Sequence, residues 1–260
     1  MAPESHRRDR CEAAGNGGSI AARKDNNPAV MAPREAPMYT RDNPSPEYLE
    51  MVRMYETMHE EGEQSAGKSG KDTFPGKMLI NHAADIRAMI THTGARSILD
   101  YGAGKGLAYQ QSDIRVTPQL TADSIQSYWG VDDIRCYDPG YEPFSTLPDQ
   151  QYDGVISTDV LEHITEPDVP WIIEEMFSYA RRFVFANVAC FPAVKNLPNG
   201  QNAHCTLHPP EWWAGLVHGI AMRHTDISYR LVMSTKTGAR KKMGLSKKRR
   251  TVYHTVERLL

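Results

Sequence analysis

The sequence predicts an α/β fold, with a mostly parallel sheet and helices on both of its faces. First, the apolar run 97–100 leads into a glycine loop, which is typical of a buried strand, a tight turn and a helix start over 105–111. Second, the apolar runs 152–157 and 183–190 enclose an amphipathic stretch, 171–182, as expected of a strand-helix-strand unit. Third, residues 226–235 and 251–259 alternate like two antiparallel strands that close the sheet.

Two segments precede this core. Residues 1–43 are rich in small, polar and charged side chains, so we expect a disordered N-terminal tail. Residues 44–73 are expected to form a helical lid or linker. Its helix begins at Ser45-Pro46, and its apolar face consists of Tyr48, Met51, Val52, Tyr55 and Met58. The main domain is then expected to span residues 74–260.

Composition narrows the class of protein. The 260 residues carry a net charge of −2, so the overall charge does not attract nucleic acid. Four widely spaced cysteines without a Cys-x-x-Cys pair argue against a zinc ribbon or a disulfide framework. No apolar run approaches the ~20 residues of a membrane span, and the N-terminus has no signal-peptide core. We therefore expect a cytoplasmic protein that does not bind membranes.

The glycine loop has the features of a ligand-binding loop. Gly102, Gly104 and Gly106 alternate, and glycine lets a ligand approach the backbone closely. The spacing differs from the Gly-x-Gly-x-x-Gly of dinucleotide binding, and Asp100 precedes the first glycine by two residues. This carboxylate would repel a pyrophosphate and favour an ammonium group. The motif Asp-Tyr-Gly-Ala-Gly-Lys-Gly at 100–106 resembles the first motif of the class I S-adenosylmethionine-dependent methyltransferases.

This resemblance implies a Rossmann-like fold with a seven-stranded, mostly parallel sheet and a C-terminal antiparallel hairpin. It also implies that Asp100 and the three glycines hold the methionine end of S-adenosylmethionine. Cys-Tyr-Asp-Pro at 136–139 is similar to the acidic end of the family's second strand, so Asp138 is the expected ribose-binding carboxylate. Asp138 lies unusually late after the glycines. We therefore expect an insertion near 116–128, with Asp132 as the alternative carboxylate.

Residues 152–164 are similar to the family's fourth strand and the loop that follows it. Because the carboxyl ends of neighbouring parallel strands form one crevice, Asp159, Glu162 and His163 are expected near the transferred methyl group, and Asp159 also near the cofactor. His163 is the expected general base, because the pKa of histidine lies near the working pH. Glu162 is expected to orient His163 or to act as the base itself.

A metal site is the alternative reading of the same residues. Asp159, Glu162, His163 and the later His204 resemble the pattern of the metal-dependent Hen-type small-RNA 2′-O-methyltransferases and ubiquinone-pathway O-methyltransferases. Asp159 stands where that pattern has a glutamate. Such ligands would suit magnesium, manganese or iron. Without a metal, His204 is expected either to contact the substrate or to be a hydrogen-bonded loop histidine. The block 202–213 ends in Trp212 and Trp213, one of which is expected to pack while the other faces the cleft.

We therefore expect an enzyme, a methyltransferase that acts on an oxygen or nitrogen of a small polar metabolite, sugar or nucleotide derivative. The alternative acceptor is RNA or DNA, because residues 240–250 carry seven positive charges that would attract a phosphate backbone. A third possibility is a non-catalytic module that binds S-adenosylmethionine. The oligomeric state is left open.

Overall fold

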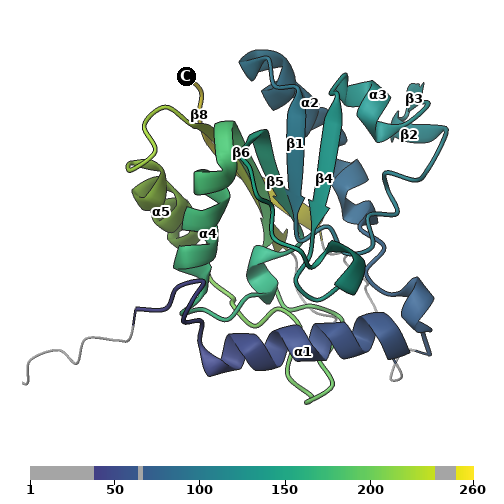
Figure 1. Ribbon diagram of the computed structural model, residues 1–260, viewed down its shortest axis with the longest axis vertical. Helices are drawn as coiled ribbons and strands as arrows, with labels where there is room; N and C mark the ends of the chain where they lie inside the picture. The colour runs from purple at the N-terminus through teal and green to yellow at the C-terminus, as the bar shows by residue number, and fades with distance from the viewer. Residues whose placement is uncertain (1–37, 64–66, 238–249) are drawn as a thin grey trace, which may run out of the picture. The chain divides into compact units, whose positions relative to one another are not determined.

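The computed structural model describes residues 38–63, 67–237 and 250–260 (Figure 1). Most of the predicted tail, residues 1–37, lies outside the described residues, and so does most of the basic segment 240–250. Residues 38–43 are described, and Arg41 donates hydrogen bonds to the Glu175 carboxylate and the Tyr101 hydroxyl. No helix in the described ranges is both long and apolar enough to cross a bilayer.

The main sheet has six strands in the order β4-β1-β5-β6-β7-β8. Their bounds are β1 Ser97–Tyr101, β4 Asp133–Tyr137, β5 Tyr152–Thr158, β6 Ala180–Ala189, β7 Ser228–Thr237 and β8 Arg250–Arg258. Every pairing is parallel except that of β7 with β8, which is antiparallel. The α/β class, the mostly parallel sheet and the closing hairpin are confirmed.

Among the described residues the main sheet has six strands and not the expected seven, and the insertion between β1 and β4 does not join it. The insertion forms a separate hairpin of β2 Ile114–Thr117 and β3 Leu120–Ala122, followed by the short helix α3 Ile125–Trp129. The helix expected over 105–111 does not form, and this segment is in turns. The amides of Lys105 and Leu107 donate instead to the carbonyls of Phe74 and Pro75.

Helices cover both faces of the sheet (Figure 1). The helices α4 Val169–Tyr179 and α5 Pro210–Ala221 contribute Ile172, Phe177 and Trp213 to one buried cluster. The helix α2 Ala83–Thr93 and α3 contribute Ile86 and Ile125 to the cluster on the other face. Short 3₁₀ turns complete the chain: η2 Gly70–Asp72, η3 Lys77–His82, η4 Glu142–Phe144 and η5 Leu161–His163.

The first helix, α1 Pro46–Glu61, does not cover either face. It runs beside the carboxyl ends of β1 and β4, at the bottom of Figure 1. Ser45 caps the helix by accepting the amide proton of Tyr48, and the Ser45 hydroxyl donates to the buried carboxylate of Asp168. This anchor fixes the start of α1 next to α4, so that the apolar face of α1 lies over the edge of the sheet where the predicted site residues are.

Candidate functional site

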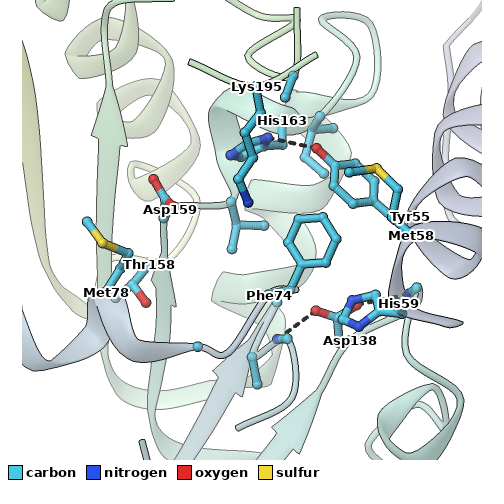
Figure 2. A pocket seen from close by; sticks show the side chains of 18 of the residues that line it. Tyr55, Met58, His59, Phe74, Met78, Asp138, Thr158, Asp159, His163 and Lys195 are labelled. Atoms are coloured by element: carbon cyan, nitrogen blue, oxygen red, sulfur yellow. Dashed lines mark hydrogen bonds between the residues drawn. The ribbon is translucent and has the colours of Figure 1, made fainter. Parts of the chain in front are cut away.

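A cavity of about 520 Å³ lies at the carboxyl ends of β1, β4 and β5. Its volume lies within the range of small-molecule sites, roughly 300–1,000 Å³. Apolar side chains of α1, including Tyr48, Met51 and Met58, form one wall. The glycine loop and the segments 191–195 and 203–204 form the others, so the cavity is the crevice expected of an open α/β sheet (Figure 2).

The glycine loop has the backbone conformation that its sequence predicts. Gly102, Gly104 and Gly106 all have positive φ, at 85°, 55° and 59°. A Cβ atom on Gly104 would lie 2.5 Å from the carbonyl oxygen of Phe74, so a larger residue would not fit there. The amide of Gly102 donates to the carbonyl of Tyr137, which ties the loop to the end of β4. Gly102 and Gly104 line the cavity, whereas Gly106 does not.

Asp100, at the end of β1, is a buried carboxylate that lines the cavity, and only one of its two oxygens has a hydrogen-bond partner among the described residues. Its Oδ2 accepts a hydrogen bond from the Tyr109 hydroxyl at 2.7 Å, whereas its buried Oδ1 has no hydrogen-bond partner among the described residues. Burial raises the pKa of Asp100 to about 7, although the Tyr109 hydrogen bond opposes this. A buried acceptor without a partner is costly, so this oxygen is poised to bind a donor.

Asp138 lies at the end of β4, adjacent to the glycine loop. Its two carboxylate oxygens accept the amide protons of Gly104 at 2.7 Å and Gly140 at 2.9 Å. Burial raises its pKa, and these backbone hydrogen bonds oppose the rise. Asp132, the alternative carboxylate, is at the other end of the strand, where it is exposed and paired with Arg96. Of the two carboxylates, Asp138 lines the cavity and Asp132 does not.

Asp159, directly after β5, lines the cavity beside Thr158. It has a positive φ of 62°, which is uncommon for a residue with a side chain and is found disproportionately at functional sites. Its amide donates to Oδ1 of Asn187 on β6, which holds this turn in place. Burial raises the pKa of Asp159, while nearby His204 and Lys195 act in the opposite direction.

Glu162 does not line the cavity, in contrast to the expectation that it faces the transferred methyl group. The side chain is fully buried, and Oε1 accepts the amide proton of Ala189 at 2.6 Å. Burial, with a smaller contribution from Asp159, raises the pKa of Glu162 to about 8. The residue follows Asp159 in a 3₁₀ turn rather than in an α-helix, and this turn points the carboxylate toward β6.

His163 lines the cavity and contacts α1. Its Nδ1 lies 2.7 Å from the hydroxyl of Tyr55 on α1 (Figure 2). Burial, followed by the influence of His204, lowers the pKa of His163 to about 3, and a backbone hydrogen bond with Ala203 opposes this. The imidazole is therefore neutral at physiological pH.

His204 also lines the cavity, with its ring edge-on to His163 at 4.7 Å between centroids. Its Nδ1 lies 2.6 Å from the carbonyl oxygen of Phe191, and a carbonyl can only accept, so Nδ1 carries the proton. In the neutral ring, Nε2 is then the nitrogen with the free lone pair. A backbone carbonyl that fixes a histidine tautomer in this way is common at metal and catalytic sites.

The predicted four-residue metal set is only partly assembled. Within the described part of the chain, donor atoms of Asp159, His163 and His204 lie within 4.8 Å of one another. Glu162 is not in this group. Nδ1 of His163 is already hydrogen-bonded to Tyr55, and its ring also has a backbone hydrogen bond with Ala203. The residues as arranged do not fit the expected four-ligand site, so no step of the chemistry below is assigned to a metal.

Three functional candidates were not identified from the sequence: Tyr55 as a partner of His163, Lys105 and Lys195. The Lys105 ammonium turns away from the cavity and donates to the carbonyls of Gly70 and Thr73 at 2.7 and 3.0 Å, and it contacts His59 at the end of α1. Lys195 lines the cavity and lies over the Phe74 ring. These contacts join distant segments, which no local pattern reports.

Neither tryptophan of the 202–213 block lines the cavity. Trp213 is fully buried in the core, whereas Trp212 stacks on His208 with centroids 4.0 Å apart. Large aromatic surfaces gain most from burial, and the core between α5 and the sheet provides it. The prediction that one tryptophan packs is confirmed, whereas the prediction that the other faces the cleft is wrong.

Comparison of the chain with protein-family models gives no match, and a search of the curated proteins also gives no significant match.

Proposed function

We propose that the protein is an S-adenosylmethionine-dependent methyltransferase that acts on an oxygen or nitrogen of a small molecule. One observation carries the proposal. Asp100 lines the cavity next to Gly102 and Gly104, and its buried Oδ1 has no hydrogen-bond partner among the described residues. A buried carboxylate oxygen is an unfavourable neighbour for a phosphate and a strong acceptor for an ammonium group. The amino-acid end of S-adenosylmethionine carries such a group.

The second carboxylate supports the same ligand. Asp138 already accepts two backbone amides, and each carboxylate oxygen retains a further lone pair. The two hydroxyls of a ribose can donate to these lone pairs. The aromatic and sulfur-containing side chains of α1 would then cover the adenine, since Tyr48, Met51 and Met58 line this wall. In this arrangement, α1 excludes water from the bound cofactor.

The acceptor would occupy the part of the cavity near Asp159 and His204. When bound, S-adenosylmethionine supplies an activated methyl group, so the chain's main task is to hold the nucleophile in line. Such positioning can contribute roughly 7–11 kcal/mol. His204 is the better general base, because its Nε2 lone pair is free whereas Nδ1 of His163 is engaged by Tyr55. We therefore assign to His204 the removal of the acceptor proton.

The acceptor class follows from the walls of the cavity. Phe74, Phe191, Met78 and Val194 surround its polar groups, and α1 covers it. Such a site suits a small molecule with an apolar part better than a long polymer. The basic segment expected to contact RNA or DNA lies mostly outside the described residues, and no observation in the described part of the chain favours a nucleic-acid acceptor.

Calorimetric titration with S-adenosylhomocysteine tests the proposal. We expect micromolar binding to the wild-type protein and no binding of NAD, since Asp100 would repel its pyrophosphate. Thermal stabilisation should accompany binding, because a ligand that binds only the folded state raises its stability. Absence of S-adenosylhomocysteine binding to folded protein, or equal binding of NAD, would refute the proposed function.

A further inference from the structure

We propose that Tyr55 on α1 is a positioning residue. Its hydroxyl donates a hydrogen bond to Nδ1 of His163 and thereby holds the neutral imidazole in the tautomer that carries its proton on Nε2. In this arrangement, His163 is a link between α1 and the loop that carries His204, and it is neither the base nor a metal ligand. The catalytic meaning of this link rests on the proposed function. The hydrogen bond between Tyr55 and His163 is tested separately from catalysis.

The geometry around the Tyr55 hydroxyl is specific. The oxygen lies 2.7 Å from Nδ1 of His163, and the two residues are 108 positions apart in the chain (Figure 2). The Tyr55 ring is held edge-on between Phe74, at 5.2 Å between centroids, and His163, at 6.0 Å. On its other side, a Cβ atom added to Gly140 would lie only 2.9 Å from Cβ of Tyr55. The phenol therefore packs against two rings, those of Phe74 and His163.

The direction of the hydrogen bond follows from the acidity of the two groups. A phenol is a better proton donor than a neutral imidazole N–H, and an imidazole nitrogen is a better acceptor than a phenol oxygen. Tyr55 therefore donates and Nδ1 of His163 accepts, which leaves the imidazole proton on Nε2. The backbone of Ala203 raises the pKa of His163, as expected of a carbonyl that accepts a proton from the ring.

Ala203 connects the His163 ring to His204, because it is the residue directly before His204. The His163 ring contacts Ala203, and the amide of Ala203 donates to the carbonyl of Lys195. Met58, one turn after Tyr55 on α1, packs with Ala203 and Leu197 in a small buried cluster. The C-terminal half of α1 therefore supports the loop that orients His204, and Tyr55 provides its polar contact.

Nitrogen-15 NMR of histidine-labelled protein tests the tautomer. Two-bond proton–nitrogen correlations distinguish Nδ1–H from Nε2–H rings, and His163→Gln identifies the signals of His163. In the wild type at pH 7.5 we expect a single Nε2–H tautomer. In Tyr55→Phe we expect a mixture of tautomers, because Nδ1 loses its donor. Tyr48→Phe, on the same helix and on the same cavity wall, should leave the His163 signals unchanged.

Hydrogen exchange supplies the readout for positioning. Tyr55→Phe should accelerate exchange of the Ala203 amide about fivefold, the equivalent of one lost hydrogen bond of about 1 kcal/mol. Tyr48→Phe should not change it. An Nδ1–H tautomer of His163 in the wild type, or unchanged tautomer and exchange in Tyr55→Phe, would overturn the link. Titration of the wild-type protein with S-adenosylhomocysteine reports on the proposed function and does not depend on Tyr55, so the two failures are distinguishable.

Discussion

Replacing Asp100 with asparagine should stabilise the ligand-free protein while abolishing tight cofactor binding. Asparagine has nearly the same shape and its carbonyl oxygen can accept the Tyr109 hydrogen bond, so the change removes mainly the charge. Burial raises the pKa of Asp100 from 3.8 to about 7. A folded-state pKa above the unfolded value means that stability is lost as the pH rises from about 4 to about 7.

The magnitude follows from these values. A rise from 3.8 to about 7 corresponds to about 4 kcal/mol, at 1.36 kcal/mol for each pKa unit. Burying the side-chain amide of the asparagine costs about 1–3 kcal/mol, which is subtracted from this gain. At pH 8 Asp100→Asn should therefore raise the free energy of unfolding by about 1–3 kcal/mol. Near pH 4 the carboxyl is protonated and only the cost of the amide remains, so the variant should be less stable than wild type by about 1–3 kcal/mol. Losing one partner of a buried charge pair costs about 2–5 kcal/mol in binding, which is roughly 30- to 4,000-fold in affinity.

Urea denaturation at pH 4 and pH 8 and calorimetry with S-adenosylhomocysteine at pH 8 measure both effects. Asp153→Asn is the matched control, because Asp153 is also buried in the sheet. Asp153 accepts the amides of Arg96 and Ser97 and pairs with Arg181, which together lower its pKa. This control should lose stability and keep its cofactor affinity. Unchanged affinity in Asp100→Asn would refute the assignment of the ammonium site.

Three further variants test other parts of the site. Gly104→Ala should destabilise the protein by about 2 kcal/mol or more in urea, because its φ is positive and its Cβ would meet Phe74; a stability equal to wild type would contradict this geometry. Lys105→Met should accelerate amide hydrogen exchange around His59, at the end of α1, because the Lys105 ammonium contacts this residue. Exchange in the first turn of α1 should not change, and an equal change along the whole helix would show that Lys105 does not hold its end in place. His204→Gln should retain S-adenosylhomocysteine affinity within about twofold, because His204 is assigned to the acceptor; a large loss in calorimetry would move it to the cofactor site.

Local patterns explain what could be predicted from the sequence. The glycine loop and Asp100 were identified because a buried strand, a turn and an acid are adjacent in the chain. Asp138 was proposed despite the long insertion, because residues 136–139 resemble the acidic end of the family's second strand. In the structure this strand, β4, pairs with β1. The helix over 105–111 was a wrong expectation, because backbone donors of this segment bond to residues 74–75. The seventh strand implied by the resemblance is not found among the described residues.

The arrangement around the histidines depends on contacts that no local pattern contains. His163 and Glu162 are neighbours in sequence, but the 3₁₀ turn directs one toward α1 and the other toward β6. The helical spacing of Tyr55 predicted an apolar face, and only the tertiary fold brings its hydroxyl to His163. His204 was identified as a candidate, whereas its free nitrogen follows from the contact with the Phe191 carbonyl.

A crystal structure of the protein with S-adenosylhomocysteine tests the central claim most directly. We expect the ligand's ammonium group within hydrogen-bond distance of Oδ1 of Asp100 and its ribose hydroxyls on Asp138. Its sulfur should point toward the space beside Asp159 and His204. A ligand bound outside the cavity, or one whose amino-acid end lies away from Asp100, would contradict the account.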